Sequence, residues 1–398
     1  NDEVIFFGSK AESSSRRGER RGRVPFTSPK QYLSTHALDA LDDRLPPDID
    51  PTGQYSAKQL ITLYLAYLLR RAERAAGEQM LDWPPRFRIA RPAWKAERAK
   101  WGEQTLRELV RHAFIVLDHI GDDILSDDGL PHDRVKQAFA AIPDTSDHPD
   151  EKIFEISEQD TATVPEATAV AAASIRPKRR RVVVVADIGG GTSDFAAFTT
   201  GVAGRNVVAE IAGSAAVLRE AGDYLDMQLR RMLMNKAGLL ADDPAARGAV
   251  SQIRAQQREL KETLFVEGKV VTEAGDQFIE LSLEEFLADK LVQGFSARLA
   301  AKFYEAVTPA VNWAREIAAT AGGQQAIEIL PTGGGHSLPM VAEMIRTIPH
   351  EWTFGVMQPE LFQSKNTDFA MVAPQLAVSI GGAVLELPKE VGAVQARA

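Results

Sequence analysis

The sequence predicts an α/β protein in which mixed sheets are flanked by helices. Short apolar runs typical of strands and longer patterns of helical period occupy separate blocks, and successive strands are close enough along the chain to pair. The 398 residues are 44% hydrophobic and 25% charged, as in an ordinary folded protein. At roughly 150 residues per domain, we expect two or three domains.

In the first 120 residues, the hydrophobic pattern predicts two long helices and two short strands. Leucines at helical spacing define the first helix, and an apolar stripe of the same period defines the second. A basic run interrupted by glycines reads as a surface loop, with an anion or partner contact as the alternative. In order, these elements are a strand at residues 4–7, the loop at 16–23, a helix at 56–76, a strand at 87–90 and a helix at 96–120.

An acidic, turn-rich segment follows at residues 121–160. It contains two Asp-Asp pairs, at 122–123 and 127–128, and one short helix near 133–141. Polar segments of this kind bury little apolar surface, so we expect an insertion that is mobile or poorly packed. The spacing of an EF-hand is absent, which argues against a calcium site.

From Arg181 onward, strands joined by glycine turns become more frequent. Helical patterns alternate with them up to the end of the chain. The expected elements are strands at 182–186, 195–199 and 206–211, helices at 224–236 and 246–263, a hairpin at 269–272 and 278–281, a largely helical stretch at 283–319, a strand at 327–330 followed by a helix, and a last helix at about 374–387.

The composition excludes several classes of protein. There are 46 Lys and Arg against 55 Asp and Glu, a net charge of −9, whereas a non-specific nucleic-acid binder is basic. Cysteine is absent, which removes disulfides, thiolate metal sites and cysteine catalysis and fits a cytoplasmic protein. The longest aliphatic run, Val182–Ala186, is far too short to span a bilayer, and no signal-peptide pattern opens the chain, so we expect no membrane contact.

The strongest local signal lies in the turn between the strands at 182–186 and 195–199. This turn contains Gly189, Gly190 and Gly191. Glycines let backbone N–H groups approach a bulky anion, and the Thr192 hydroxyl can also bind phosphate. Asp187 and Asp194 flank the turn, and two carboxylates repel a phosphate unless a cation lies between, so they indicate Mg²⁺ held through water. The alternative is a hairpin in which the glycines only form the turn.

A second glycine turn contains Gly333, Gly334 and Gly335. It also follows a strand and precedes a helix, a pattern that is common in α/β proteins when it occurs alone. Together with the first turn, it indicates a nucleotide held from two sides. The P-loop pattern GxxxxGKS/T does not occur, which excludes that solution to nucleotide binding.

These two turns resemble those of the superfamily that actin, sugar kinases and the seventy-kilodalton heat-shock chaperones share. In that superfamily a DxGGGTxD loop grips the β- and γ-phosphates of ATP, and Asp187–Asp194 is similar to it. A later GG turn holds the adenosine, and Gly333–Pro339 is similar to that turn. The resemblance implies a two-lobed actin-like ATPase fold with mixed sheets, two smaller tip subdomains, and ATP or ADP with Mg²⁺ between the lobes.

Further segments narrow the resemblance to the ATPase domain of the heat-shock chaperones. They are Pro29–Leu33, Phe87–Trp94, Val164–Ala169, Arg258–Leu264 and Ala373–Gly382. Taken in this order, the five segments resemble the family's catalytic-lysine segment, its strand with a VPAYF turn, its EPTAA segment, its adenosine-contacting helix and its closing helix. The resemblance spans nearly the whole chain in the family's order.

The resemblance also implies roles for single residues. Glu166 and Asp187 would orient the water around Mg²⁺ and the attacking water. Thr192 would bind the γ-phosphate, whose charge Lys30 would stabilise, because phosphoryl transfer depends on positioning and electrostatics. Lys261 would lie at the nucleotide. A surface lysine and a helix-start acid are the structural alternatives for Lys30 and Glu166.

The implied domain organisation has two lobes. The first lobe comprises residues 1–180, with a tip subdomain at 1–60 and the acidic insertion. The second lobe comprises 181–371, with a tip subdomain at 223–300. Residues 372–398 would form a helix that returns to the first lobe.

The chain also departs from the family's pattern. Ser337 stands where the family has an adenine-stacking arginine, and Glu262 stands at a second basic position. The family's first phosphate loop is not found, so we expect an N-terminally incomplete piece or a degenerate ATPase. The family's peptide-binding region is not found either, so a protein partner or client would bind outside this chain. An actin-like filament or scaffold protein, and a pseudo-ATPase with a regulatory nucleotide, are the alternatives.

Overall fold

The computed structural model describes residues 4–18, 25–26, 29–35, 39–82, 87–91, 94, 96–143, 161–176, 180–201, 207–239, 246–274, 277–321, 326–348, 353–384 and 387–391. Within these residues the fold is α/β with mixed sheets, as the sequence predicts. The helices are α1 (Gly8–Gly18), α2 (Pro29–Thr35), α3 (Ala57–Glu78), α4 (Ala96–Ile120), α5 (His132–Ala140), α6 (Glu166–Ser174), α7 (Gly222–Lys236), α8 (Arg247–Glu267), α9 (Leu283–Ala288), α10 (Lys290–Ala321), α11 (Pro339–Arg346) and α12 (Thr367–Gly382), with 3₁₀ turns η2 (Asp39–Asp42), η3 (Gly121–Leu125) and η6 (Glu360–Gln363). The strands are β1 (Val4–Ile5), β2 (Phe87–Arg91), β3 (Leu130–Pro131), β4 (Thr161–Pro165), β5 (Val182–Ile188), β6 (Ser193–Thr200), β7 (Val208–Ile211), β8 (Ala216–Leu218), β9 (Lys269–Ala274), β10 (Gln277–Ser282), β11 (Ile327–Thr332), β12 (Phe354–Val356) and β13 (Lys389–Val391).

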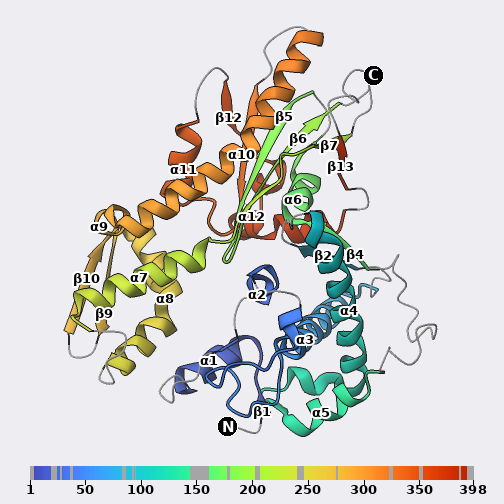
Figure 1. Cartoon of the computed structure of the whole chain (residues 1–398), viewed down its shortest axis with the longest axis vertical. Coiled ribbons are helices and arrows are strands. Elements are labelled where there is room, and N and C mark those ends of the chain that lie inside the picture. Colours follow the sequence, from blue (N-terminus) through green and yellow to red (C-terminus); the bar gives the residue numbers. More distant parts are fainter. Residues whose placement is uncertain are drawn as a thin grey trace.

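The largest sheet has the strand order β12-β11-β5-β6-β7-β13, and β8 also pairs with β6 (Figure 1). On one side of β5, β11 runs parallel to it and β12 runs parallel to β11. On the other side, β6 runs antiparallel to β5. Every residue of β5 is buried, because helices cover both faces of the sheet and an uninterrupted apolar strand suits that position.

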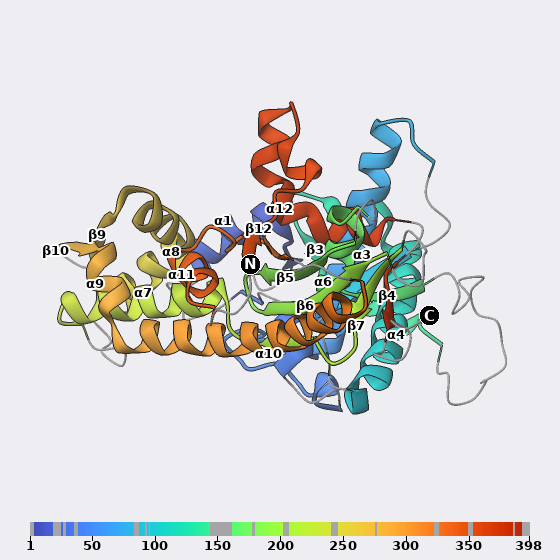
Figure 2. The ribbon, with the colours of Figure 1, turned by 90° about the horizontal axis from the view of Figure 1, so that it is seen from above.

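The side chains of β5 alternate between two apolar clusters, one on each face of the sheet. Val182 and Val184 belong to the larger cluster, which residues of α7, α8 and α10 complete. Val183 and Val185 belong to a smaller cluster under α6 and α12. In Figure 2, α10 runs along one side of the sheet and α12 lies on the other.

A separate apolar core lies among the first 143 residues, where α3 and α4 pack side by side with α5 beneath them (Figure 1). Leu63, Leu109 and Val116 are fully buried there. The Ser56 hydroxyl accepts the Gln59 N–H and the Gln59 side chain accepts the Ser56 N–H, so a capping box starts α3. Two strand pairs lie nearby, β1 antiparallel to β3 and β2 parallel to β4.

The described part of the acidic segment packs into this core. Residues 121–143 contain η3, β3 and α5, and their apolar side chains Ile124, Leu130 and Val135 are at most 2% exposed. The expectation of poor packing is therefore wrong for residues 121–143. Polar residues between these positions, such as Asp127, Asp128 and Arg134, face water, so the mean polarity of the segment conceals its buried positions. Residues 144–160 lie outside the described part of the chain.

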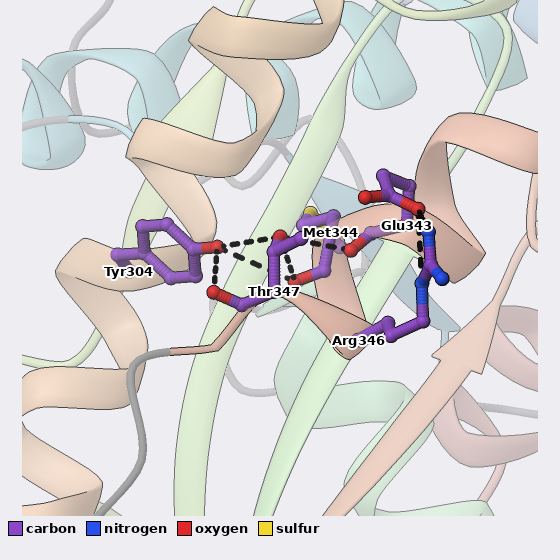
Figure 3. A network of polar contacts seen from close by, with 5 residues as sticks. All are labelled: Tyr304, Glu343, Met344, Arg346 and Thr347. Atoms are coloured by element: carbon purple, nitrogen blue, oxygen red, sulfur yellow. Dashed lines mark hydrogen bonds and ion pairs between the residues drawn. The ribbon is translucent and has the colours of Figure 1, made fainter.

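A polar network fixes α11, the helix that follows the second glycine turn, to the long helix α10 (Figure 3). The Tyr304 hydroxyl on α10 lies 3.0 Å from both the carbonyl oxygen and the hydroxyl of Thr347, and 3.5 Å from the Met344 carbonyl oxygen. Arg346 forms an ion pair with Glu343 on the exposed side of α11. The network thereby holds the far side of the glycine turn in place.

The structure differs from the expected elements at several short segments. α2, β4, α6, β8, β12 and β13 have no counterpart in the sequence-based expectations. α1 extends over residues 16–18, which were expected as loop, while residues 19–23 lie outside the described residues.

The last helix begins earlier than expected, at Thr367, and ends at Gly382. The expected range began at about Pro374, and proline is usually costly inside a helix because it lacks an N–H donor. The structure places Pro374 inside α12 instead, where its carbonyl oxygen accepts hydrogen bonds from the Thr332 hydroxyl and the Gly333 N–H.

Among the helices that the structure describes, none is long and apolar enough to cross a membrane.

Candidate functional site

Four charged side chains from distant parts of the chain meet at one end of the large sheet. Lys30 lies in the first turn of α2, and Glu166 is the first residue of α6. Asp187 and Asp194 lie where β5 ends and β6 begins. The Lys30 ammonium forms an ion pair with the Glu166 carboxylate, 136 positions away, and also interacts electrostatically with both aspartates. Lys30 is therefore not an isolated lysine, and Glu166 stands at the start of a helix, as its structural alternative has it, while also pairing with Lys30.

The pairing of β5 with β6 explains the position of the two aspartates. The antiparallel register sets Asp187 directly opposite Asp194, with the glycine turn closing the hairpin beyond them. The Gly189 N–H donates to the Thr192 carbonyl oxygen at 2.9 Å, and the Thr192 hydroxyl donates to Asp194 Oδ2 at 2.8 Å. Both Thr192 and Asp194 are 1% exposed, so their polar atoms are held without competition from bulk water.

Burial and mutual repulsion perturb the carboxylates of this cluster. Burial raises the pKa of Asp187 to about 8, helped by the charges of Glu166 and Asp194 and opposed by Lys30. Burial also raises the pKa of Glu166, although the Lys30 ammonium acts in the opposite direction. For Lys30, burial lowers the pKa, but the carboxylates around it outweigh that effect and the net shift is upward.

The cluster has three carboxyl groups and one ammonium, so its acidic groups outnumber its basic ones. Among the described residues, no group of three or more ligand-type side chains is close enough together to hold a metal ion directly. The water-mediated cation at Asp187 and Asp194 stays a prediction.

The second glycine turn lies beside the first because β11 pairs in parallel with β5. Thr332 is in register with Asp187, and the Gly335 N–H donates to the Ile188 carbonyl oxygen at 2.8 Å. Gly333 has φ +80°, and a Cβ there would lie 2.4 Å from the Ile188 carbonyl oxygen and 2.5 Å from Asp187 Oδ1. Only glycine lets the turns approach this closely. A Cβ on Gly334 would meet nothing within 4 Å, so this part of the turn is open to a ligand.

The start of α7 holds the first glycine turn from another side. The Gly222 N–H donates to the Gly189 carbonyl oxygen at 3.2 Å, and the Asp223 N–H donates to the Gly190 carbonyl oxygen at 2.7 Å. Lys261 reaches across from α8, and its ammonium donates to the Gly222 carbonyl oxygen at 3.1 Å. These three contacts fix the conformation of the first glycine turn against the start of α7.

Lys261 is itself held by Asp226 on α7, 2.9 Å away and 6% exposed. Gly222 and Asp223 were not predicted as site residues because the expected helix starts only at Tyr224, and Asp226 was not predicted because no local pattern pairs it with Lys261. A glycine followed by an acid at the start of a helix is the signal that could have revealed them. Glu262 and Ser337, the two positions that depart from the family's pattern, take no part in these contacts. Glu262 pairs with Arg258 at 3.0 Å on the exposed face of α8, and Ser337 is exposed.

The arrangement brings two glycine turns and the start of α7 together beside the carboxylate pair, with Lys30 among the carboxylates and Lys261 at Gly222. The raised pKa of Asp187 lets it exchange a proton near neutral pH. No protein-family model matches the chain, and no curated protein matches it either.

Proposed function

We propose that this chain binds ATP or ADP with Mg²⁺ and hydrolyses ATP, as a domain similar to the nucleotide-binding domain of the seventy-kilodalton heat-shock chaperones. The observation that carries the proposal is the meeting of the Lys30–Glu166 ion pair with Asp187 and Asp194 beside two glycine turns. A purely structural ion pair does not need adjacent glycine turns or an excess of buried carboxylates.

The proposal includes a two-lobed actin-like fold with the nucleotide between the lobes. Two observations favour it. The apolar core around α3 and α4 is separate from the clusters on the two faces of the large sheet. α12 packs against α6 and β2, so the end of the chain returns to elements from before residue 181. We further propose a cytoplasmic location, which a cysteine-free chain fits.

The residues present fit a magnesium nucleotide. Without a cation, the pKa of Asp187 is about 8, because the carboxyl is buried and two other carboxylates face it. A divalent cation would lower that pKa and neutralise the phosphate charge, which is the chemistry that Mg²⁺ supplies when bound. Asp187 and Asp194 would hold its water ligands.

In the reaction, this chain's residues mainly position the nucleotide and stabilise the charge that develops on its phosphates. The N–H groups of Gly190, Gly191 and Gly334, which donate to no backbone carbonyl oxygen among the described residues, bind phosphate oxygens. The Thr192 hydroxyl, whose single hydrogen is directed at Asp194 in this structure, turns to donate to the γ-phosphate. The Lys30 ammonium stabilises charge on the transferred phosphoryl group. A water attacks phosphorus, the bond to the ADP oxygen breaks, and Glu166 or Asp187 accepts the proton that this water loses. The products are ADP and inorganic phosphate.

The test compares two lysine variants. Lys30→Gln removes the ammonium of the cluster. Lys58→Gln removes a different ammonium, on α3 and away from the site, which pairs with Glu108 of α4 at 2.8 Å. Calorimetric titration with MgADP and MgATP measures binding, and phosphate release measures turnover. We expect binding in all three proteins and a loss of turnover of at least about a hundredfold in Lys30→Gln alone.

The alternatives give different outcomes. Binding without phosphate release in the parent chain would favour the pseudo-ATPase. ATP-dependent light scattering that rises with protein concentration would favour the filament-forming protein. Absence of nucleotide binding would overturn the proposal.

A further inference from the structure

A second candidate binding site lies among the first 143 residues and shares no residue with the cluster around Lys30. It is a cavity of about 370 Å³ between the loop that precedes α3, the first turn of α3, and α5. This volume is typical of small-molecule sites. The lining residues are Arg44, Gly53, Gln54, Tyr55, Gln59, Lys136 and Phe139.

The loop that forms one wall of this cavity is held in a fixed conformation. Asp50 is 6% exposed, and its carboxylate accepts the N–H groups of Thr52 at 3.0 Å and Tyr55 at 2.8 Å. The Tyr55 hydroxyl lies 2.6 Å from Nδ1 of His132, which ties the loop to the start of α5. A ligand would therefore meet a wall that is already organised, which reduces the entropic cost of binding.

The polar groups of the cavity favour an anion. Arg44 and Lys136 line it, and none of its lining residues is acidic. Arg44 donates one N–H to the Gln54 carbonyl oxygen, which orients the guanidinium and leaves further donors for a ligand. Among the residues that the structure describes, the ion pair of Lys136 is a long one, 3.9 Å from the exposed carboxylate of Asp133. Exposed pairs at such a distance contribute little, so the ammonium is available.

Two amides and a ring complete the surface. The side-chain oxygen of Gln54 is buried and has no hydrogen-bond partner within the described part of the chain, so it lacks a donor. The Gln59 oxygen accepts the Ser56 N–H, which leaves its amide nitrogen as a donor. The Phe139 ring supplies apolar area beside Lys136, three positions earlier on the same face of α5.

We propose that this cavity binds a small organic anion. The phosphate or carboxylate head group binds to Arg44 and Lys136, and an aromatic or apolar body packs against Phe139. Charge-assisted hydrogen bonds of this kind are about twice as strong as neutral ones, so both cations matter for affinity.

The experiment uses three probes that share a phenol ring and differ in the head group: 4-hydroxyphenyl phosphate, 4-hydroxybenzoate and 4-hydroxybenzyl alcohol. Calorimetric titration at pH 7, with excess MgADP present to occupy the glycine turns, measures each dissociation constant. We expect one anion to bind with 1:1 stoichiometry at least about tenfold more tightly than the alcohol. The preferred anion identifies the head group as phosphate or carboxylate.

Single variants locate the binding. Arg44→Gln and Lys136→Gln each weaken the preferred anion about tenfold. Arg134→Gln serves as the control, because Arg134 lies on α5 outside the cavity and pairs with Asp123 at 3.0 Å; it changes affinity less than about twofold. Circular dichroism verifies that each variant folds. The proposal is overturned if neither anion binds at millimolar concentration, if the alcohol binds equally well, if the Arg44→Gln/Lys136→Gln double variant binds like the parent, or if Arg134→Gln weakens binding as much as the cavity variants.

Discussion

Replacing Asp187 by asparagine tests the electrostatics of the carboxylate cluster directly. In the folded protein the pKa of Asp187 is raised from an ordinary 3.8 to about 8, because burial and the charges of Glu166 and Asp194 disfavour its ionised form. Asparagine has nearly the same shape and carries no ionisable group. The variant therefore removes the repulsion and leaves the packing in place.

The sign and size of the effect follow from proton linkage. Below about pH 4, folded and unfolded chains both hold the proton on Asp187, so the shift has no effect on stability. From pH 4 to 8 the unfolded chain releases it and the folded chain keeps it, so the parent loses about 1.4 kcal/mol of stability per pH unit. At pH 7 the loss is on the order of 4 kcal/mol, and Asp187→Asn should recover most of it.

The assay is urea unfolding of the parent and variant in EDTA at several values between pH 4 and pH 8. The difference between the two free energies of unfolding isolates Asp187, since all other groups titrate in both proteins. Asp50→Asn is a control of opposite sign. Burial acts to raise the pKa of Asp50, but hydrogen bonds from Thr52 and Tyr55 lower it on balance, so the parent is favoured at neutral pH and the difference fades as the pH falls below about 4.

A stability difference for Asp187→Asn that does not change between pH 4 and pH 8 would refute the reasoning. Saturating MgADP provides a second check. If the proposed function is right, the cation binds the ionised carboxylate, and the advantage of the variant shrinks or reverses in its presence.

Three further predictions concern the turns and the support of α11. Thr192→Ala should slow phosphate release by at most about tenfold while nucleotide binding persists, since one hydroxyl hydrogen bond contributes about 0.5 to 1.5 kcal/mol; an unchanged rate would contradict the assigned role. Gly333→Ala should lower the free energy of unfolding in urea by about 2 to 5 kcal/mol, because its Cβ would clash with a backbone carbonyl oxygen and φ is positive, whereas Gly334→Ala should cost less than about 1 kcal/mol. Equal effects of the two substitutions would contradict the close approach of the turns. Tyr304→Phe should lower the thermal midpoint by the equivalent of about 1 kcal/mol, the size of one exchanged hydrogen bond, and a midpoint identical to the parent's would argue against the contact with Thr347.

Local pattern was enough for the long elements and for the glycine turn of the hairpin. The predicted helix at residues 96–120 coincides with α4, because its apolar stripe has the helical period and faces a core. The run Val182–Ala186 identified β5, since a strand buried on both faces is continuously apolar. The turn between Asp187 and Asp194 was visible because glycines at adjacent positions have few other uses.

Other features depended on contacts between distant segments. The sequence left Lys30 as either a surface lysine or a site residue, because no local pattern encodes an ion pair with a partner 136 positions away. Val135 in the acidic segment is buried only because α3 and α4 offer it a core, so its neighbours in sequence gave no sign of it. The cavity beside Arg44 likewise exists only where a loop, α3 and α5 meet. Backbone propensity and hydrophobic period act over a few residues, so the sequence alone reveals them. Ion pairs between distant residues, the burial of a side chain and the gathering of carboxylates depend on tertiary contacts, so they are defined only in the folded molecule.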